Sequence, residues 1–238
     1  MTKLNKALSL IILVLIAVSC KKDRDTNFTL NGHIKGIKKG VVYLQKNGDS
    51  SDIVDLDSVQ IQGEPNFSLH TNIDEPILMY LKLFKNDGEE HYIPFFADKG
   101  ITEINTTLKN FNFDAKIKGA KQQDLLNEYT DMITKFNNQN LDLMQANFIA
   151  QKDNDTIALD SIIRRSNNLI KRKYAFIIQF AMNNKNSAIA PYIALYEMPN
   201  ANPKYIDSVY YALNDTIKNS FYGKKLNDII SNRNSAAE

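Results

Sequence analysis

The feature that most constrains this chain is a change in hydrophobic period close to Gly119. Before Gly119, apolar residues such as Phe28, Leu30 and Ile34 alternate with polar ones, which is the pattern of strands that bury one face. After Gly119, apolar residues recur every three or four positions, as they do on amphipathic helices. The sequence therefore predicts an α+β protein in which a β domain, residues 27–119, precedes a helical module, residues 120–231, and a flexible tail, residues 232–238.

The β domain is predicted from short apolar runs that are separated by turn residues. The runs cover residues 28–34, 41–44, 53–61, 67–69, 77–84, 92–96, 101–106 and 113–117. Gly, Asn and Asp at 63–66, 86–88 and 98–100 supply the conformations that hairpin turns require. Strands spaced at about ten residues are typical of an antiparallel β-sandwich or barrel.

The helical module is expected to begin with a long antiparallel hairpin. One face of its first helix is predicted to carry Leu125, Tyr129, Met132, Ile133, Phe136, Asn140 and Leu143. The corresponding stripe of the second helix is Leu159, Ile162, Ile163, Leu169, Ile170, Phe176, Ile177 and Phe180. The polar turn at 152–155 between them favours packing of these two faces against each other.

Capping residues define the expected helix starts. Asn154 or Asp155 can cap the second hairpin helix, and three shorter helices are predicted to begin at Ser187, at Asn202 and at Asp215. Pro203, directly after Asn202, suits the first position of a helix.

The first 20 residues indicate export and lipid anchoring. Lys3 and Lys6 precede an apolar run at residues 7–18, which is shorter than the roughly 20 residues that span a bilayer. Residues 17–20 (AVSC) resemble a bacterial lipobox, with Ala17 in place of the usual Leu. We therefore expect a lipoprotein signal peptide at 1–19, cleavage between Ser19 and Cys20, and acyl chains such as palmitate on Cys20.

The residues after Cys20 sharpen the expected location. Residues 20–26 form a lipidated leash, and its segment 21–25 (KKDRD) resembles the export signal of Bacteroidetes surface lipoproteins. The expected location is thus the cell envelope, at the outer membrane, on either its periplasmic or its exposed side. The alternative is an ordinary secretory signal with an incidental cysteine.

Charge and cysteine content exclude two classes of function. The chain has 29 Lys and Arg against 27 Asp and Glu, and removal of the leader with Lys3 and Lys6 leaves 27 of each. A neutral mature chain lacks the basic surface that nucleic acids need. Cys20 is the only cysteine, so acylation leaves no thiol for a disulfide or for redox chemistry.

Several segments resemble one known family. In the β domain they are 28–34 (FTLNGHI), 40–44 (GVVYL), 56–59 (LDSV), 67–69 (FSL) and 94–100 (PFFADKG). They are similar to a domain of unknown function that lies N-terminal to the thioredoxin-like domain in Bacteroidetes thiol:disulfide interchange lipoproteins. In the helical module, 186–192 (NSAIAPY) and 220–226 (SFYGKKL) resemble the segment that joins those two domains. No Cys-x-x-Cys motif is present, so the resemblance implies no oxidoreductase activity.

Candidate catalytic and metal-binding residues do not form a recognisable set. His33, His70 and His91 fall on separate strands, and strand parity points the first two toward solvent, which disfavours a zinc site. The acid pairs at 74–75 and 89–90 lie in predicted turns, where solvated charge is commoner than a pair of glycosidase carboxylates. We therefore predict no catalytic, cofactor-binding or metal-binding residues.

Two further predicted surfaces each allow two interpretations. Arg164, Arg165 and residues 171–173 form a basic helix face that either is simply solvated or meets acidic headgroups. Aromatic rings in the last third either form a helical core or offer a platform for sugars; they are Tyr192, Tyr196, Tyr205, Tyr210, Tyr211 and Tyr222.

Asp-Ser/Thr-apolar triplets recur along the chain. They resemble the acceptor motif of Bacteroidetes O-glycosylation, although the same residues also cap helices. The candidate acceptors are Ser58, Thr156, Ser161, Ser208 and Thr216.

The function expected from these features is that of a lipid-anchored, non-enzymatic binding or scaffolding module. The alternative is an enzyme with an unrecognised site on the β domain. An expected partner is another envelope protein, and the family resemblance favours one of thioredoxin-like fold. The apolar stripe at the C-terminus is predicted to pack on the helix hairpin; it consists of Ile217, Phe221, Leu226, Ile229 and Ile230.

Overall fold

The computed structural model describes residues 26–48, 52–85, 89–198 and 201–235. The predicted signal peptide, its cleavage site between Ser19 and Cys20, the lipidated Cys20 and the leash as far as residue 25 lie outside these ranges. No helix within the described ranges is long and apolar enough to cross a membrane.

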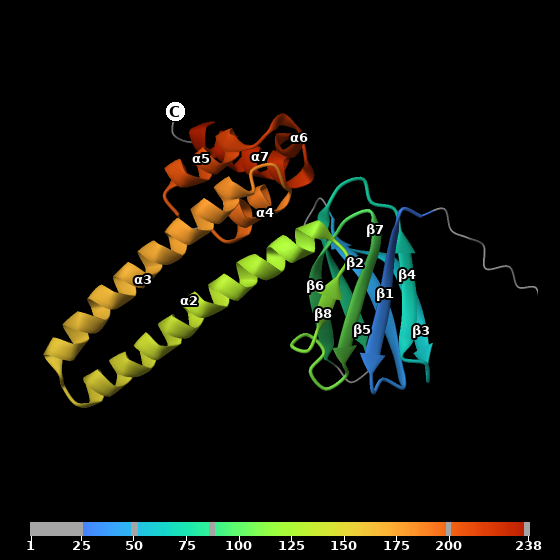
Figure 1. Ribbon diagram of the computed structural model, residues 1–238, viewed down its shortest axis with the longest axis horizontal. Coiled ribbons are helices and arrows are strands. Elements are labelled where there is room, and N and C mark those ends of the chain that lie inside the picture. Colours follow the sequence, from blue (N-terminus) through green and yellow to red (C-terminus); the bar gives the residue numbers. More distant parts are fainter. Residues whose placement is uncertain (1–25, 49–51, 86–88, 199–200, 236–238) are drawn as a thin grey trace, which may run out of the picture.

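The described N-terminal residues form eight strands in two packed sheets, which confirms the sandwich of the predicted α+β fold (Figure 1). The strands are β1 (Phe28–Lys35), β2 (Lys39–Asn47), β3 (Ile53–Gln62), β4 (Asn66–Thr71), β5 (Ile77–Phe84), β6 (Glu90–Ala97), β7 (Gly100–Thr107) and β8 (Lys116–Lys118). One sheet has the order β4-β1-β7-β8 and the other β3-β2-β5-β6. All described pairs are antiparallel except β1 with β7, which is parallel.

The alternation in β1 places its apolar residues in the core between the sheets. Phe28, Leu30 and Ile34 are fully buried there. Gly32 shares their inward parity, and a Cβ atom on it would lie 2.0 Å from the Phe67 ring on the neighbouring strand. The ring therefore occupies the volume that any larger residue at position 32 would need.

The segment at 113–117, predicted as a strand, is instead mostly a turn. Only Lys116–Lys118 pair with β7, and the Phe113 side chain is 88% exposed. The Asp114 carboxylate accepts a hydrogen bond from Thr107, and the Asp114 backbone N–H donates to the Asn110 carbonyl. Such short polar side chains stabilise turns in competition with strand pairing.

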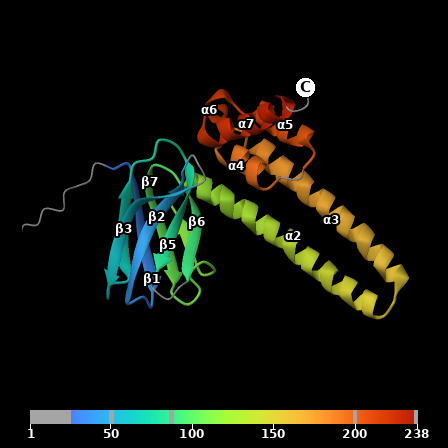
Figure 2. The ribbon, with the colours of Figure 1, turned by 180° about the vertical axis from the view of Figure 1, so that it is seen from behind.

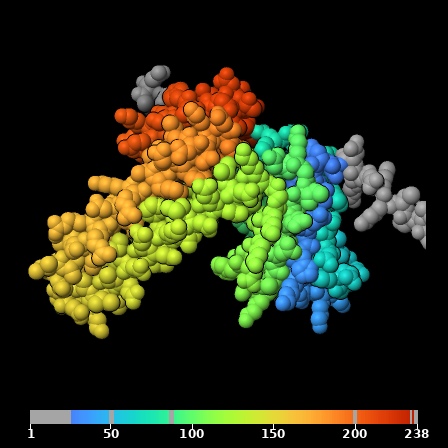
Figure 3. Space-filling view, in the orientation of Figure 1, coloured from blue at the N-terminus to red at the C-terminus, as the bar shows by residue number. Residues whose placement is uncertain are grey.

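Six helices follow within the described residues. They are α2 (Lys121–Lys152), α3 (Thr156–Asn183), α4 (Ile189–Tyr196), α5 (Pro203–Ala212), α6 (Asp215–Lys218) and α7 (Phe221–Ser235). The antiparallel hairpin of α2 and α3 projects away from the sandwich (Figures 1 and 2). Helices α4 to α7 lie beside the end of the hairpin that is nearest the sandwich, and together with that end they form what we call the base of the helical module. In the space-filling view, the yellow tip of the hairpin stands clear of all other elements (Figure 3).

Helix starts agree with the predicted caps at two places and differ at two others. Asp155 and Asn202 accept backbone hydrogen bonds at the starts of α3 and α5. Ser187 does not cap α4, because its hydroxyl donates to Gln122 on α2 at 2.5 Å. The cap of α6 is Asn214 rather than Asp215.

The hairpin seam is narrower than predicted. Buried residues between α2 and α3 include Phe136, Leu143, Ala150, Ile162 and Leu169. Three residues that we assigned to this seam are exposed instead; they are Asn140, Ile163 and Ile170. Because an α-helix has 3.6 residues per turn, these three side chains point away from a seam whose residues repeat every seven positions.

The sandwich and the base of the helical module share one apolar cluster. Leu78 and Phe96, from the outer face of the β3-β2-β5-β6 sheet, pack with residues of α2, α3, α4 and α7. The Leu78 N–H donates to the Tyr222 hydroxyl oxygen at 3.0 Å, and the Phe96 N–H donates to the Gln123 side-chain oxygen at 2.7 Å. The Glu75 carboxylate accepts from the first N–H of α7, at Phe221.

The C-terminal apolar stripe is divided between two helices and packs differently from the prediction. Ile217 lies on α6, and α7 begins after a break at residues 219–220 and continues to Ser235. Leu226 and Ile230 are buried mainly against α4 and α5 rather than along the hairpin, and Ile229 is exposed. Part of the stripe is therefore core, because α4 and α5 supply the apolar surface that it needs.

Candidate functional site

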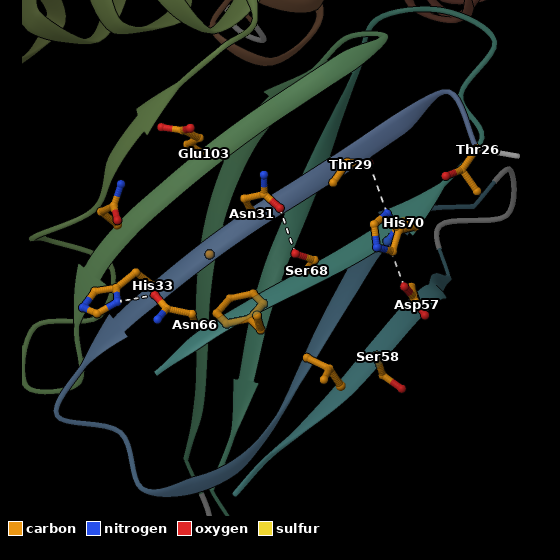
Figure 4. Close-up of a pocket in the computed structure, with 14 residues that line it drawn as sticks. Thr26, Thr29, Asn31, His33, Asp57, Ser58, Asn66, Ser68, His70 and Glu103 are labelled. Atoms are coloured by element: carbon orange, nitrogen blue, oxygen red, sulfur yellow. Dashed lines mark hydrogen bonds between the residues drawn. The ribbon is translucent and has the colours of Figure 1, made fainter. Parts of the chain in front are cut away.

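A polar hollow of about 1210 Å³ lies on the outer face of the β4-β1-β7-β8 sheet, along its β4 edge, where β3 of the other sheet approaches (Figure 4). Its described lining is Thr26, Thr29, Asn31, Gly32, His33, Asp57, Ser58, Val59, Asn66, Phe67, Ser68, His70, Glu103 and Asn105. Most of these carry hydroxyl, amide, imidazole or carboxylate groups, and none is Lys or Arg. This polar groove therefore suits a ligand that exchanges many hydrogen bonds and carries no strong negative charge.

The pairing register of β1 with β4 builds the floor of the polar groove. Thr29 lies opposite His70, and its Oγ1 atom is hydrogen-bonded to the His70 Nδ1 atom at 3.1 Å. Asn31 accepts a hydrogen bond of 2.8 Å from the Ser68 hydroxyl. The next pair, His33 with Asn66, has a hydrogen bond of 2.7 Å between Nδ1 and Oδ1.

These three pairs are all of the type without backbone hydrogen bonds. The Ile34 N–H donates to the Pro65 carbonyl at 3.0 Å. In β1, the residues that lie an even number of positions from Ile34 therefore also direct their backbone N–H and C=O groups toward β4. Thr29, Asn31 and His33 have the opposite parity. Such pairs bring their side chains closest, which explains the row of side-chain hydrogen bonds.

The same parity turns backbone groups of β4 toward the polar groove. The His70 N–H points away from β1 and donates to the Asp57 carboxylate on β3 at 2.8 Å. Ser68 and Asn66 precede it by two and four residues, so their N–H and C=O groups face the same open edge. The groove thus combines a strand edge with a row of polar side chains (Figure 4).

Among the described residues of the groove, the contacts of Thr29, His70 and Asp57 differ from those of a catalytic relay. Thr29, His70 and Asp57 lie together, but the Asp57 carboxylate accepts from the His70 backbone N–H. In a nucleophile-activating triad the carboxylate orients the imidazole ring itself. The contact observed here instead ties strand β4 to strand β3.

The three histidines are dispersed. His33 and His70 line opposite ends of the polar groove, about 13 Å apart by the rise of four residues along a strand. His91 lies on β6, and its ring makes an edge-to-face contact with the Phe111 ring. Within the described residues, no three His, Cys, Asp or Glu side chains converge in a way that could hold a metal ion.

The acidic pairs have structural contacts. Glu75 caps α7, as described above. Glu90 binds Lys82 at 2.5 Å and also accepts a hydrogen bond from Tyr92. The Glu90 carboxylate raises the pKa of Lys82, and the Lys82 ammonium lowers the pKa of Glu90.

The C-terminal tyrosines divide into core and surface residues. The rings of Tyr192 and Tyr222 pack on Phe96 at 5.4 and 5.9 Å between centroids, and burial raises the pKa of Tyr192 to about 12. Tyr205 and Tyr211 are exposed. The packed rings form the joint between the sandwich and the helices rather than an open platform for sugars.

The candidate O-glycosylation residues are all exposed. Ser58 lies on β3 at the rim of the polar groove, and Thr156 and Ser161 lie in the first two turns of α3. Ser208 donates a hydrogen bond to the Lys204 carbonyl within α5, and Thr216 lies on α6. Their modification remains a prediction.

Sequence reasoning missed the polar groove, although the sequence contains a signal for it. Residues 29–33 read Thr-x-Asn-x-His and residues 66–70 read Asn-x-Ser-x-His. Two strands with small amides, hydroxyls and imidazoles at every second position predict a polar face if they are neighbours. Their adjacency, however, depends on a pairing that the sequence pattern alone does not specify.

The comparisons with known proteins match the β domain to one family model. Residues 28–126 match the family model of a domain of unknown function, DUF4369. No curated protein matches the chain, and no solved structure matches it. The match covers every described strand and the first residues of α2, and it includes all the residues of the polar groove except Thr26. The similarity to this family therefore extends over the whole described sandwich.

Proposed function

We propose that this protein is a lipid-anchored envelope protein that acts as a non-enzymatic binding module, and that its polar groove holds an extended segment of another envelope protein. The observation that carries the proposal is the β4 edge at Asn66 and Ser68, whose backbone groups point away from β1, beside three cross-strand pairs of polar side chains. Peptides added to a sheet edge gain affinity from backbone hydrogen bonds and specificity from alternate side chains. Asp57 and Glu103 favour a partner segment that is neutral or basic.

Anchoring follows from the leader. A short apolar run ending at Cys20 supports diacylation, and two acyl chains suffice for stable attachment at about 0.8 kcal/mol per buried methylene. The leash then places the β domain beside the membrane. A thioredoxin-like envelope protein is one candidate partner, because the family resemblance places such a domain next to the sandwich.

Capture of partners from detergent-solubilised envelope, with the intact lipoprotein as bait, tests the groove. Ser68→Pro removes a backbone N–H that faces the groove and leaves the hydrogen bonds between β1 and β4 in place. Ser68→Ala is the matched control, since it keeps the N–H and loses only the side-chain bond to Asn31.

We expect Ser68→Pro to lose the partner and Ser68→Ala to retain most of it, with both variants folded by circular dichroism. Equal capture by a folded Ser68→Pro protein and the wild type would show that the β4 edge is not the binding site.

Anchoring is tested separately by Cys20→Ala. This variant should be released from the membrane or accumulate with its leader uncleaved. Normal cleavage together with retention in the membrane fraction would contradict the anchor.

A further inference from the structure

The leash ends in the polar groove. Thr26, its last residue, lines the groove at the end where His70 and Asp57 lie, as Figure 4 shows. The next residue, Asn27, is fixed by hydrogen bonds to residues 72 and 73, directly after β4. Residues 20–25, which lie outside the described ranges, are therefore tethered at this end of the groove.

The leash is long enough to cover the groove. Along β4, His70 and Asn66 are four residues apart, or about 13 Å. Residues 20–25 span about 20 Å when they are extended. From Thr26 they can therefore run beside β4 as far as Asn66, and Cys20 would then lie just beyond the groove.

The β4 edge offers backbone partners to such a segment. The N–H and C=O groups of Asn66 and Ser68 face the groove, whereas the residues that alternate with them bond to β1. A leash that enters at Asn66 and ends at Thr26 runs in the same direction as β4. It can therefore add to the sheet as a parallel strand.

The positive and negative charges of the leash fall mainly on different sides of an extended chain. Side chains in an extended chain point alternately to opposite sides. Lys22 and Arg24 thus share the side of Thr26, whereas residues 21, 23 and 25, two of them Asp, lie on the other side. Because Thr26 lines the groove, the extended leash directs two cations into the groove and two carboxylates away from it.

The groove provides the complementary charge. Its described lining includes Asp57 and Glu103 but no Lys or Arg. In the extended leash, Arg24 lies about 7 Å and Lys22 about 13 Å from Thr26. Arg24 therefore falls near the end that holds Asp57, and Lys22 falls near the far end.

We propose that residues 21–25 occupy the polar groove as a parallel strand beside β4 and exclude other segments from it until they are released. The inference rests on the proposed function of the groove and adds its regulation. A segment tethered beside the groove acts at a local concentration in the millimolar range, so a free partner must displace it. The apparent affinity for that partner then falls in proportion to the fraction of grooves that are open.

Residue-resolved hydrogen exchange on the full lipoprotein in detergent tests the proposal. The Ser68 amide reports contact with the leash, and the Leu69 amide, which faces β1, reports the integrity of β4. The test variant Lys22→Glu reverses a charge on the side of Thr26. Lys21→Glu makes the same change of charge on the opposite side and is the matched control.

The Ser68 amide should exchange about 5-fold faster in Lys22→Glu than in the wild type and in Lys21→Glu, with Leu69 equally protected in all three. A synthetic peptide of residues 21–26 (KKDRDT), added at about 10 mM, should slow the Ser68 amide of Lys22→Glu. The same peptide with Glu at its second position should not slow it. Equal Ser68 exchange in the three proteins overturns the proposal, as does an equal effect of the two peptides.

The two proposals can fail separately, because neither exchange measurement involves a partner. Ser68 protection that depends on Lys22, together with no partner captured by any variant, contradicts the proposed function alone. Capture that depends on the β4 edge, together with equal Ser68 exchange in the three proteins, overturns the leash proposal alone. If the leash competes, Lys22→Glu should capture the partner at about 5-fold lower bait concentration than Lys21→Glu, and equal capture would overturn the competition.

Discussion

The two ends of the helical module are built differently. At the base, α4 and α7 pack on the sandwich through Phe96, Tyr192 and Tyr222, and backbone N–H groups of the sandwich donate to side chains of the helical module. In the part of the α2–α3 hairpin that is far from the sandwich, which we call the arm, the two helices touch mainly each other. Their contact is a single seam that includes Phe136 and Leu143. Both parts are helical, but only the base is tied into the core of another layer.

Because of this difference, we expect the base to contribute most to the stability of the protein and the arm to offer surface for binding other molecules. The base buries aromatic side chains on several sides, so its helices depend on the sandwich for their packing. The arm buries one stripe per helix and leaves the opposite side for contacts with other molecules. We therefore expect substitutions at the base to unfold the protein and comparable substitutions in the arm to change its interactions.

The largest effect is expected at Phe96. Phe96→Ala removes a fully buried ring that contacts Tyr192 and Tyr222, and such truncations cost about 3–5 kcal/mol. Phe148→Ala in the exposed arm should change the unfolding free energy of the monomer by about 0.5 kcal/mol or less. Urea denaturation of both variants measures the contrast, and similar losses of stability would remove the distinction between base and arm.

Alkaline pH should also act on the base. Burial raises the pKa of Tyr192 from 10.0 to about 12 and raises that of Tyr222 as well. Because these pKa values are raised on folding, the stability they contribute is complete below about pH 10 and declines as the pH rises toward 12.

The unfolding free energy should therefore fall by about 1–3 kcal/mol between pH 9 and pH 11, since each tyrosine contributes at most about 1.4 kcal/mol per pH unit. Tyr192→Phe should make this decline less steep. A urea midpoint that is independent of pH over this range would contradict the buried state of the two hydroxyl groups.

A smaller effect is expected inside the sandwich at Gly32. Gly32→Ala places a methyl group 2.0 Å from the present position of the Phe67 ring, so the ring must move. Overpacking of this kind costs about 1–3 kcal/mol. Adding Phe67→Leu should recover part of the loss in thermal denaturation, whereas additive losses would show that the two residues do not compete for space.

The smallest effect is expected at the tip of the arm. The Asp155 carboxylate accepts from the Ala158 N–H at 2.9 Å and caps α3, so Asp155→Ala should cost about 1 kcal/mol. Because the tip is remote from the base, the change should appear as faster amide exchange in the first turns of α3. Faster exchange in the sandwich after this substitution would mean that arm and base unfold together.

The sequence was most informative where a pattern is local. The alternation of Phe28, Leu30 and Ile34 and the caps at Asp155 and Asn202 depend on neighbouring residues, and the structure confirms them. The outward direction of Ile163 could not be predicted, because the seam of α3 depends on which residues α2 offers opposite it. At Phe113 the predicted strand is replaced by a turn because of local hydrogen bonds, those of Asp114 with Thr107 and Asn110, which the alternating pattern alone does not reveal.

The polar groove was harder to predict than the fold. Each member of the pair Asn31 and Ser68 is an ordinary polar residue on a predicted strand. They lie together because β1 and β4 pair in antiparallel register. The groove also depends on the crossing of the chain from one sheet to the other between β3 and β4. Long-range pairings of this kind are absent from any single stretch of sequence.

Hydrogen exchange measured by mass spectrometry on the intact chain tests the division between base and arm most directly. We expect the amides of β5, β6, α4 and α7 to be protected to a similar degree and to lose protection together at the same urea concentration. The amides around residues 145–165 should exchange faster and respond to substitutions in the arm alone. Loss of protection in α7 while β5 and β6 stay protected, or equal protection of tip and base, would contradict this account.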